Sequence, residues 1–195
     1  MKKFLLPVIA LISIAIVTIF ICIFGANKAI TSKEEIDTIK QDAHLDILVN
    51  LGNFSKDSYS ESMLLDVAMQ YATEIGLAND GNQDDVYFQY VEKDTLHTLI
   101  SELTGLYIEA PIVIDDFYYL YDSENSYYYY LGSSPEYFKI SKINKIERNG
   151  EKIFINCDIS KNEDGESTNM NNIAITLGIN PKNNLTKYSV IQIDF

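Results

Sequence analysis

Few side chains in this sequence are suited to catalysis. Its 195 residues include two histidines, His44 and His97, and two cysteines, Cys22 and Cys157. Nucleophilic catalysis needs a base beside Ser, Cys or Thr, and neither histidine stands in such a motif. Each histidine is typical of a helix-surface or half-buried position, and Cys157 is typical of a small core residue in a strand. The sequence therefore favours a protein without catalytic activity.

One acidic segment has the beginning of a metal-binding pattern. Asp80, Asn82 and Asp84 have the spacing of the first three ligands of a calcium loop. The sixth position, which needs glycine for a sharp turn, is Asp85, and the twelfth, which needs a bidentate glutamate, is Val91. The sequence contains no zinc spacing, phosphate loop or dinucleotide fingerprint. We therefore expect a solvated polar loop here, and neither a metal nor a cofactor.

Tyrosines are concentrated in residues 117–132, which read FYYLYDSENSYYYYLG and contain seven of the chain's fourteen tyrosines. Two strands around the turn DSENS predict a hairpin with aromatic side chains on both faces, because successive strand residues point to opposite sides. One face serves the core, so the other must be covered or exposed. Two interpretations stay open: a core hairpin, since tyrosine favours strands, or an interaction surface for a protein partner or a glycan. The candidate binding residues are Tyr118, Tyr119, Tyr121, Tyr128 and Tyr130.

The N-terminus predicts a membrane anchor. Residues 4–24 carry no charge, and an α-helix of that length spans about 30 Å, the thickness of the hydrocarbon core of a bilayer. Lysines flank both ends, so only the additional positive charge of the free amino group favours a cytoplasmic N-terminus. A cleaved signal peptide and a lipoprotein modified at Cys22 are the alternatives. The expected organisation is an anchor with flanks at 1–30 and an extracytoplasmic domain at 31–195.

Composition limits the partners of that domain. The formal net charge is −13, and all 28 acidic residues follow the anchor. This charge repels nucleic acids and anionic lipid headgroups. Lysine outnumbers arginine fourteen to one and tryptophan is absent. The two cysteines are not expected to pair, because Cys22 lies in the predicted anchor and Cys157 in a predicted strand of the domain. These features are typical of an outer domain in a low-GC Gram-positive bacterium.

Periodicity predicts helices first and strands later. The expected helices are 31–53, with a capping box at Ser32, then 58–77, with one at Ser58, and 93–105. A short strand at 86–91 and several later hairpins, one turning at Asn149-Gly150, complete the pattern. The fold class is therefore α+β, with about three helices packed on one face of a curved antiparallel sheet.

This order of elements resembles the NTF2-like superfamily of cone-shaped α+β domains, and less closely cystatin-like folds. The layout is also similar to membrane-anchored proteins of clostridia and related bacteria. Together with the predicted anchor and the lack of catalytic motifs, this layout leads us to expect a single-pass, extracytoplasmic binding or scaffolding protein with a protein partner. It also implies two alternatives. One is a subunit of a membrane complex similar to VirB8-type conjugation and secretion components. The other is an NTF2-like enzyme that pairs His97 with Asp115 or Asp116.

Overall fold

The computed structural model describes residues 28–195, apart from residues 84, 114–118, 131–136, 164–165 and 183. The predicted anchor at 4–24 lies outside the described residues, as do Tyr118, Asp115 and Asp116. Within the described part of the chain, no helix is both long enough and apolar enough to cross a membrane. The anchor therefore stays a prediction from the sequence.

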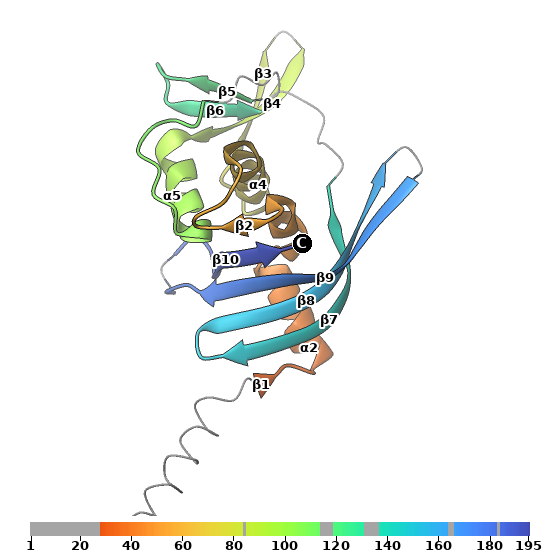
Figure 1. The fold of residues 1–195 in the computed structure, drawn as a ribbon. Coiled ribbons are helices and arrows are strands. Elements are labelled where there is room, and N and C mark those ends of the chain that lie inside the picture. The colour runs from red at the N-terminus through yellow and green to blue at the C-terminus, as the bar shows by residue number, and fades with distance from the viewer. Residues whose placement is uncertain (1–27, 84, 114–118, 131–136, 164–165, 183) are drawn as a thin grey trace, which may run out of the picture.

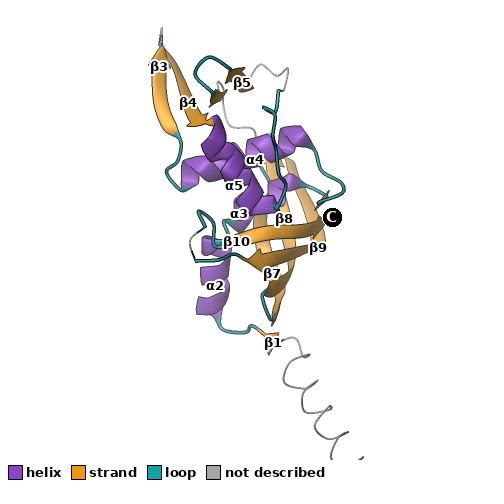
Figure 2. Ribbon diagram, turned by 90° about the vertical axis from the view of Figure 1, so that its left-hand side faces the viewer, coloured by secondary structure: helices purple, strands orange, loops and turns teal. Residues whose placement is uncertain are grey.

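The fold is α+β, as the sequence predicts, with four α-helices and two antiparallel sheets among the described residues. The helices are α2 (Lys33–Asp42), α3 (Leu45–Leu48), α4 (Glu61–Glu74) and α5 (Lys93–Thr104), and the 3-10 turn η1 (Val49–Leu51) follows α3. Figure 1 shows α4 and α5 in a layer between the two sheets, and Figure 2 shows the same order of layers from the side.

The larger sheet has six strands in the order β1-β7-β8-β9-β10-β2. Its strands are β1 (Lys28–Ala29), β7 (Lys139–Asn149), β8 (Lys152–Glu163), β9 (Glu166–Ile179), β10 (Tyr188–Asp194) and β2 (Phe54–Ser55). Four alternate residues of β8 are buried in the core, as the sequence predicts: Ile153, Ile155, Cys157 and Ile159. Burial raises the pKa of the Cys157 thiol to about 11, so this thiol stays protonated at neutral pH.

The smaller sheet has four strands in the order β3-β4-β6-β5. They are β3 (Asn79–Gln83), β4 (Val86–Glu92), β6 (Tyr127–Tyr130) and β5 (Tyr119–Asp122). The sequence predicts one curved sheet and a polar loop at 79–85, and both predictions were wrong. Residues 79–83 pair with β4 instead, because Gly81 has no Cβ and leaves room for the Phe88 ring on the opposite strand. The added strand makes a separate sheet with the tyrosine hairpin.

The first predicted helix is divided at His44, which has a left-handed backbone conformation (φ 48°). At 3.6 residues per turn, a continuous helix would place Leu48 on the side opposite Ile39. Both side chains are buried, and the break at His44 lets the chain bury them together. The cap at Ser32 is confirmed, since its Oγ accepts from the Glu35 N–H. The second helix, however, begins at Ser60 and not at Ser58.

Bulges change the expected pattern in two strands. In β10 a bulge between Val190 and Gln192 puts Val190 and Ile193 in the core, whereas strict strand alternation would place Ile191 with Ile193. In β7 two irregularities fall between Ile140 and Lys145. As a result, three lysines spaced three residues apart are all exposed: Lys139, Lys142 and Lys145.

The predicted hairpin between β7 and β8 is confirmed, with its turn shifted by one residue. Asn149 is the last residue of β7 and pairs with Lys152, so the turn is Gly150-Glu151. Of these turn residues only Gly150 has a positive φ (60°). The Asn-Gly signal therefore located the hairpin, but a type I′ turn with both residues at positive φ is not formed.

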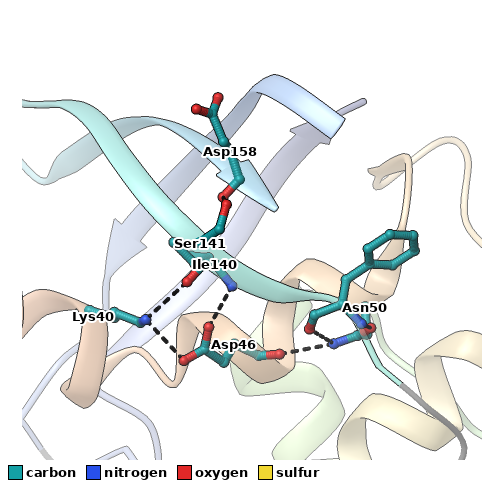
Figure 3. Close-up of polar contacts among 7 residues, drawn as sticks. Lys40, Asp46, Asn50, Ile140, Ser141 and Asp158 are labelled. Carbon is teal, nitrogen blue, oxygen red and sulfur yellow. Dashed lines mark hydrogen bonds and ion pairs between the residues drawn. The ribbon is translucent and has the colours of Figure 1, made fainter. Parts of the chain in front are cut away.

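Side chains from α2, α3 and η1 pair with the outer edge of β7 (Figure 3). The Asn50 side-chain amide donates to the Phe138 carbonyl (3.0 Å) and accepts from the Phe138 N–H (2.8 Å). Asp46 accepts from the Ile140 N–H (2.7 Å), and Lys40 donates to the Ile140 carbonyl while forming an ion pair with Asp46 (3.2 Å). These side chains fill the places that a neighbouring strand would take, and they fix the helical segment on the sheet.

Replacing Asn50 by alanine is expected to lower the free energy of unfolding by about 2–4 kcal/mol, because both backbone groups of Phe138 lose their partner in a partly buried place. The matched control is Asn144→Ala, whose amide bonds are exposed and whose loss is expected to cost less than about 0.5 kcal/mol. Urea unfolding followed by near-ultraviolet circular dichroism of the tyrosines measures both values. Equal losses in the two variants would contradict this role of Asn50.

Candidate functional site

The tyrosine hairpin forms β5 and β6, and its two faces have different surroundings. Tyr130 pairs with Tyr119 and with Gln89 of β4, and Tyr128 pairs with Tyr121 and with Val91. Val91 and Tyr128 are buried, so this face meets the helix layer. Four of the candidate residues, Tyr119, Tyr121, Tyr128 and Tyr130, therefore share the inner face of the small sheet, and Tyr118 lies outside the described residues.

Tyr128 joins the small sheet to α5 and to the segment that follows it. It is 1 % exposed, and its hydroxyl accepts from the Ile112 N–H (2.6 Å) and lies 3.0 Å from His97 Nε2. The Tyr121 ring packs on it with a centroid distance of 4.9 Å. Burial raises the pKa of Tyr128 to about 12. The hydroxyl therefore stays protonated at neutral pH, and it shares a hydrogen bond with the His97 ring.

Tyr119 joins the small sheet to α4. The Asp66 carboxylate accepts from the Tyr119 hydroxyl, from the Tyr137 hydroxyl (2.9 Å) and from the Gln70 side chain (3.2 Å). The Tyr130 ring packs beside Tyr119 with a centroid distance of 5.2 Å. Burial and the nearby carboxylate raise the pKa of Tyr119. These contacts hold the inner face against α4, beside a cavity of about 270 Å³.

The outer face of the small sheet carries a row of rings that sequence reasoning did not select. We call it the aromatic ladder: Phe88, Tyr90, Tyr127 and Tyr129. Neighbouring ring centroids lie 5.2 Å apart for Tyr90 and Tyr127 and 5.6 Å apart for Phe88 and Tyr129. All four rings are partly exposed. The sequence contains a signal for two of these rings, because Phe88 and Tyr90 alternate with Gln89 and Val91 in the predicted strand. Their position beside Tyr127 and Tyr129 depends on the pairing register of β4 with β6.

A groove of about 770 Å³ crosses the outer face, and we call it the outer groove. Its walls include rings, aliphatic side chains and carboxylates, from Val86, Phe88, Leu120, Asp122, Glu124 and Tyr129. Leu120 is 51 % exposed and Val86 is 53 % exposed. Exposed apolar side chains grouped with rings in a concave surface are a common mark of a binding site.

The outer groove has an acidic rim. Asp122 accepts from the backbone N–H groups of Glu124 (2.9 Å) and Asn125 (3.3 Å) and from the Asn125 side chain (2.6 Å). These hydrogen bonds, led by that of the Asn125 side chain, lower the pKa of Asp122. The carboxylate is therefore ionised at neutral pH and held in one place beside the aromatic ladder.

Of the candidate tyrosines from the sequence, Tyr121 also lines this groove, and the described candidates outside the hairpin lie apart from it. His97 contacts Tyr128 on the inner side, and its predicted partners Asp115 and Asp116 are outside the described residues, so that pair stays a prediction. Asp80 and Asn82 are residues of β3, and Asp80 accepts from the Gln89 side chain (3.2 Å). Within the described ranges, no cluster of three or more His, Cys, Asp or Glu side chains is arranged to hold a metal ion.

The inner tyrosines are expected to matter for stability and the outer ones are not. Tyr128→Phe removes the acceptor of the buried Ile112 N–H and is expected to lower the free energy of unfolding by about 1–3 kcal/mol. Tyr129→Phe on the outer face is the matched control, with an expected change within about 0.5 kcal/mol. Urea unfolding of both variants measures the contrast. Comparable losses would show that the outer rings are also structural.

His97 is expected to make stability depend on pH. Burial and Lys93 lower the pKa of His97, against the opposing effects of a backbone hydrogen bond at Ile108 and of Asp94. The folded state thus favours the neutral ring, and its contribution is full above the unfolded pKa of about 6.5 and is lost as the pH falls through the folded pKa. The wild type should lose stability relative to His97→Gln between pH 7.5 and 5. Urea unfolding at four pH values measures this, and a constant difference would contradict it.

Comparisons of the chain with protein-family models, curated proteins and solved structures give no match. The resemblance to NTF2-like domains therefore stays a prediction. What the chain does must be inferred from its own geometry, in which the outer groove combines exposed rings, exposed aliphatic side chains and fixed negative charge.

Proposed function

We propose that this protein is a non-catalytic binding domain, held on the outer side of a bacterial cell membrane by a single helix at residues 4–24. The observation that carries the proposal is the outer face of the small sheet, where the aromatic ladder and the outer groove lie together. The described residues that line the outer groove include no histidine or cysteine. The domain acts by holding a partner.

The amino-acid types of this face support a protein partner. Tyrosine has a large apolar ring with a polar hydroxyl, so it gains contact area on binding while remaining compatible with water in the free state. Aromatic side chains are enriched at the centres of protein interfaces, where they provide most of the binding energy. The aromatic ladder supplies four such rings in one row, with Leu120 and Val86 exposed beside them.

The position of the small sheet supports the same function. Residue 28, where the described chain begins, enters through β1 at one end of the molecule, and the small sheet lies at the other end (Figure 1). A helix that anchors the chain before β1 would leave the outer face pointing away from the bilayer. A partner in the space outside the cell would then reach the groove freely.

Site-specific photo-crosslinking tests the proposal in intact cells. The full-length chain carries a photoreactive phenylalanine analogue either at Leu120, in the outer groove, or at Leu185, which is exposed beside the six-stranded sheet. Irradiation is expected to give a discrete adduct from Leu120 and none from Leu185, in membranes that have been washed with alkaline carbonate. Adducts from neither or both positions would contradict the site, and a chain released into the medium would contradict the anchor.

A further inference from the structure

Basic side chains are absent from the sheet that carries the outer groove. Residues 79–92 and 119–130, which include all four strands and their turns, contain six acidic residues and no lysine or arginine. Between Lys56 and Lys139 the sequence has a single basic residue of these two types, Lys93, at the start of α5. The chain therefore concentrates negative charge on the part of the surface that also exposes its rings.

The carboxylates and the aromatic rings of the outer groove together favour a cationic ligand over a neutral or anionic one. Two carboxylates, Asp122 and Glu124, lie at one end of the groove, and Phe88 and Tyr129 form a corner with an interplanar angle of 59°. The faces of aromatic rings attract ammonium and guanidinium groups, and carboxylates attract the same groups by charge. A neutral sugar would gain from the rings alone. An anionic ligand would be repelled by the rim.

The shape of the groove indicates an extended chain rather than a small cation. It runs across β4, β6 and β5, whose neighbouring strands are about 4.8 Å apart, so the crossing is about 10 Å long. An extended polypeptide advances about 3.3 Å per residue, which gives room for about three residues. The groove is open to solvent along this length. A segment of a partner can therefore lie in it without being threaded.

We propose that the outer groove binds an extended, lysine- or arginine-bearing segment of a partner protein, an inference that rests on the proposed function. The long side chains of the segment pack their aliphatic stems on Leu120 and Val86 and place their charges between the rings and the carboxylates of Asp122 and Glu124. A second copy of this chain is a poorer occupant, because each copy has a net charge of −13 and the copies repel each other.

Fluorescence anisotropy of a defined peptide tests the inference on the full-length protein in a neutral detergent. The probe is an end-blocked peptide of eight residues that alternates lysine and serine and carries a neutral fluorophore; matched peptides replace lysine by glutamine or glutamate. The lysine peptide is expected to bind, and the other two are not. Raising the salt from about 0.05 M to 0.5 M is expected to weaken binding, because exposed charge pairs are screened.

Substitutions locate the binding to the groove. Asp122→Asn with Glu124→Gln is expected to weaken binding about 2- to 30-fold, the range for two exposed charge pairs, while the asparagine still accepts the turn's backbone N–H groups. Tyr129→Ser is expected to weaken it about 2- to 5-fold. The control with the same change of charge is Asp57→Asn with Glu151→Gln, on the six-stranded side of the molecule. This control is expected to bind like the parent.

The alternative outcomes overturn the inference in different ways. Equal binding of the glutamine peptide, or no effect of the charge variant, would contradict the claim that cationic side chains of the partner are recognised. Binding of an N-acetylglucosamine tetramer in place of the lysine peptide makes the groove a glycan site. Self-association that the charge variant abolishes, seen by sedimentation, makes a second copy the occupant. If Leu120 still crosslinks in cells while the lysine peptide does not bind, the proposed function stands and only this inference fails.

Discussion

The side-chain amide of Asn50 fixes the first helical segment on the edge of the six-stranded sheet. Asn50 makes both hydrogen bonds to Phe138 that a neighbouring strand would make, and Asp46 and Lys40 do the same for Ile140. This contact fixes η1 on the six-stranded sheet, and α4 packs against η1. Because Asp66 of α4 binds Tyr119, the orientation of the small sheet depends in turn on the same contact.

Because successive residues of a strand point to opposite sides, the small sheet has one face packed on the helices and one face with partly exposed rings. Its inner hydroxyls bind Asp66, the Ile112 N–H and His97, so this face is fixed by directional bonds as well as by burial. A slip of one residue would exchange the faces and leave those polar groups without partners. The inner contacts therefore determine which tyrosines face the solvent, and the aromatic ladder is exposed as a consequence of bonds made on the opposite side.

Features that depend on local sequence could be predicted, and features that depend on long-range pairing could not. The cap at Ser32, the end of α5 at Gly105 and the alternation in β8 all follow from neighbours in the chain. Strand β3 has no apolar alternation and forms because Phe88 fits over Gly81. The hairpin could be predicted from its tyrosines. Which of its two faces is buried, however, depends on the pairing register with β4 and on the contact with Asp66, and neither can be recognised from the local sequence.

The uneven distribution of charge gives the domain an electric dipole along its length. Residues 139–187, mostly from the six-stranded sheet, hold eight lysines and arginines and six acidic residues, so their charges nearly balance, while the small sheet at the far end has acidic residues and no lysine or arginine. Next to an anionic bilayer the acidic small sheet is repelled more strongly than the nearly neutral six-stranded sheet. On the proposed anchor this difference in repulsion would keep the small sheet turned away from the membrane.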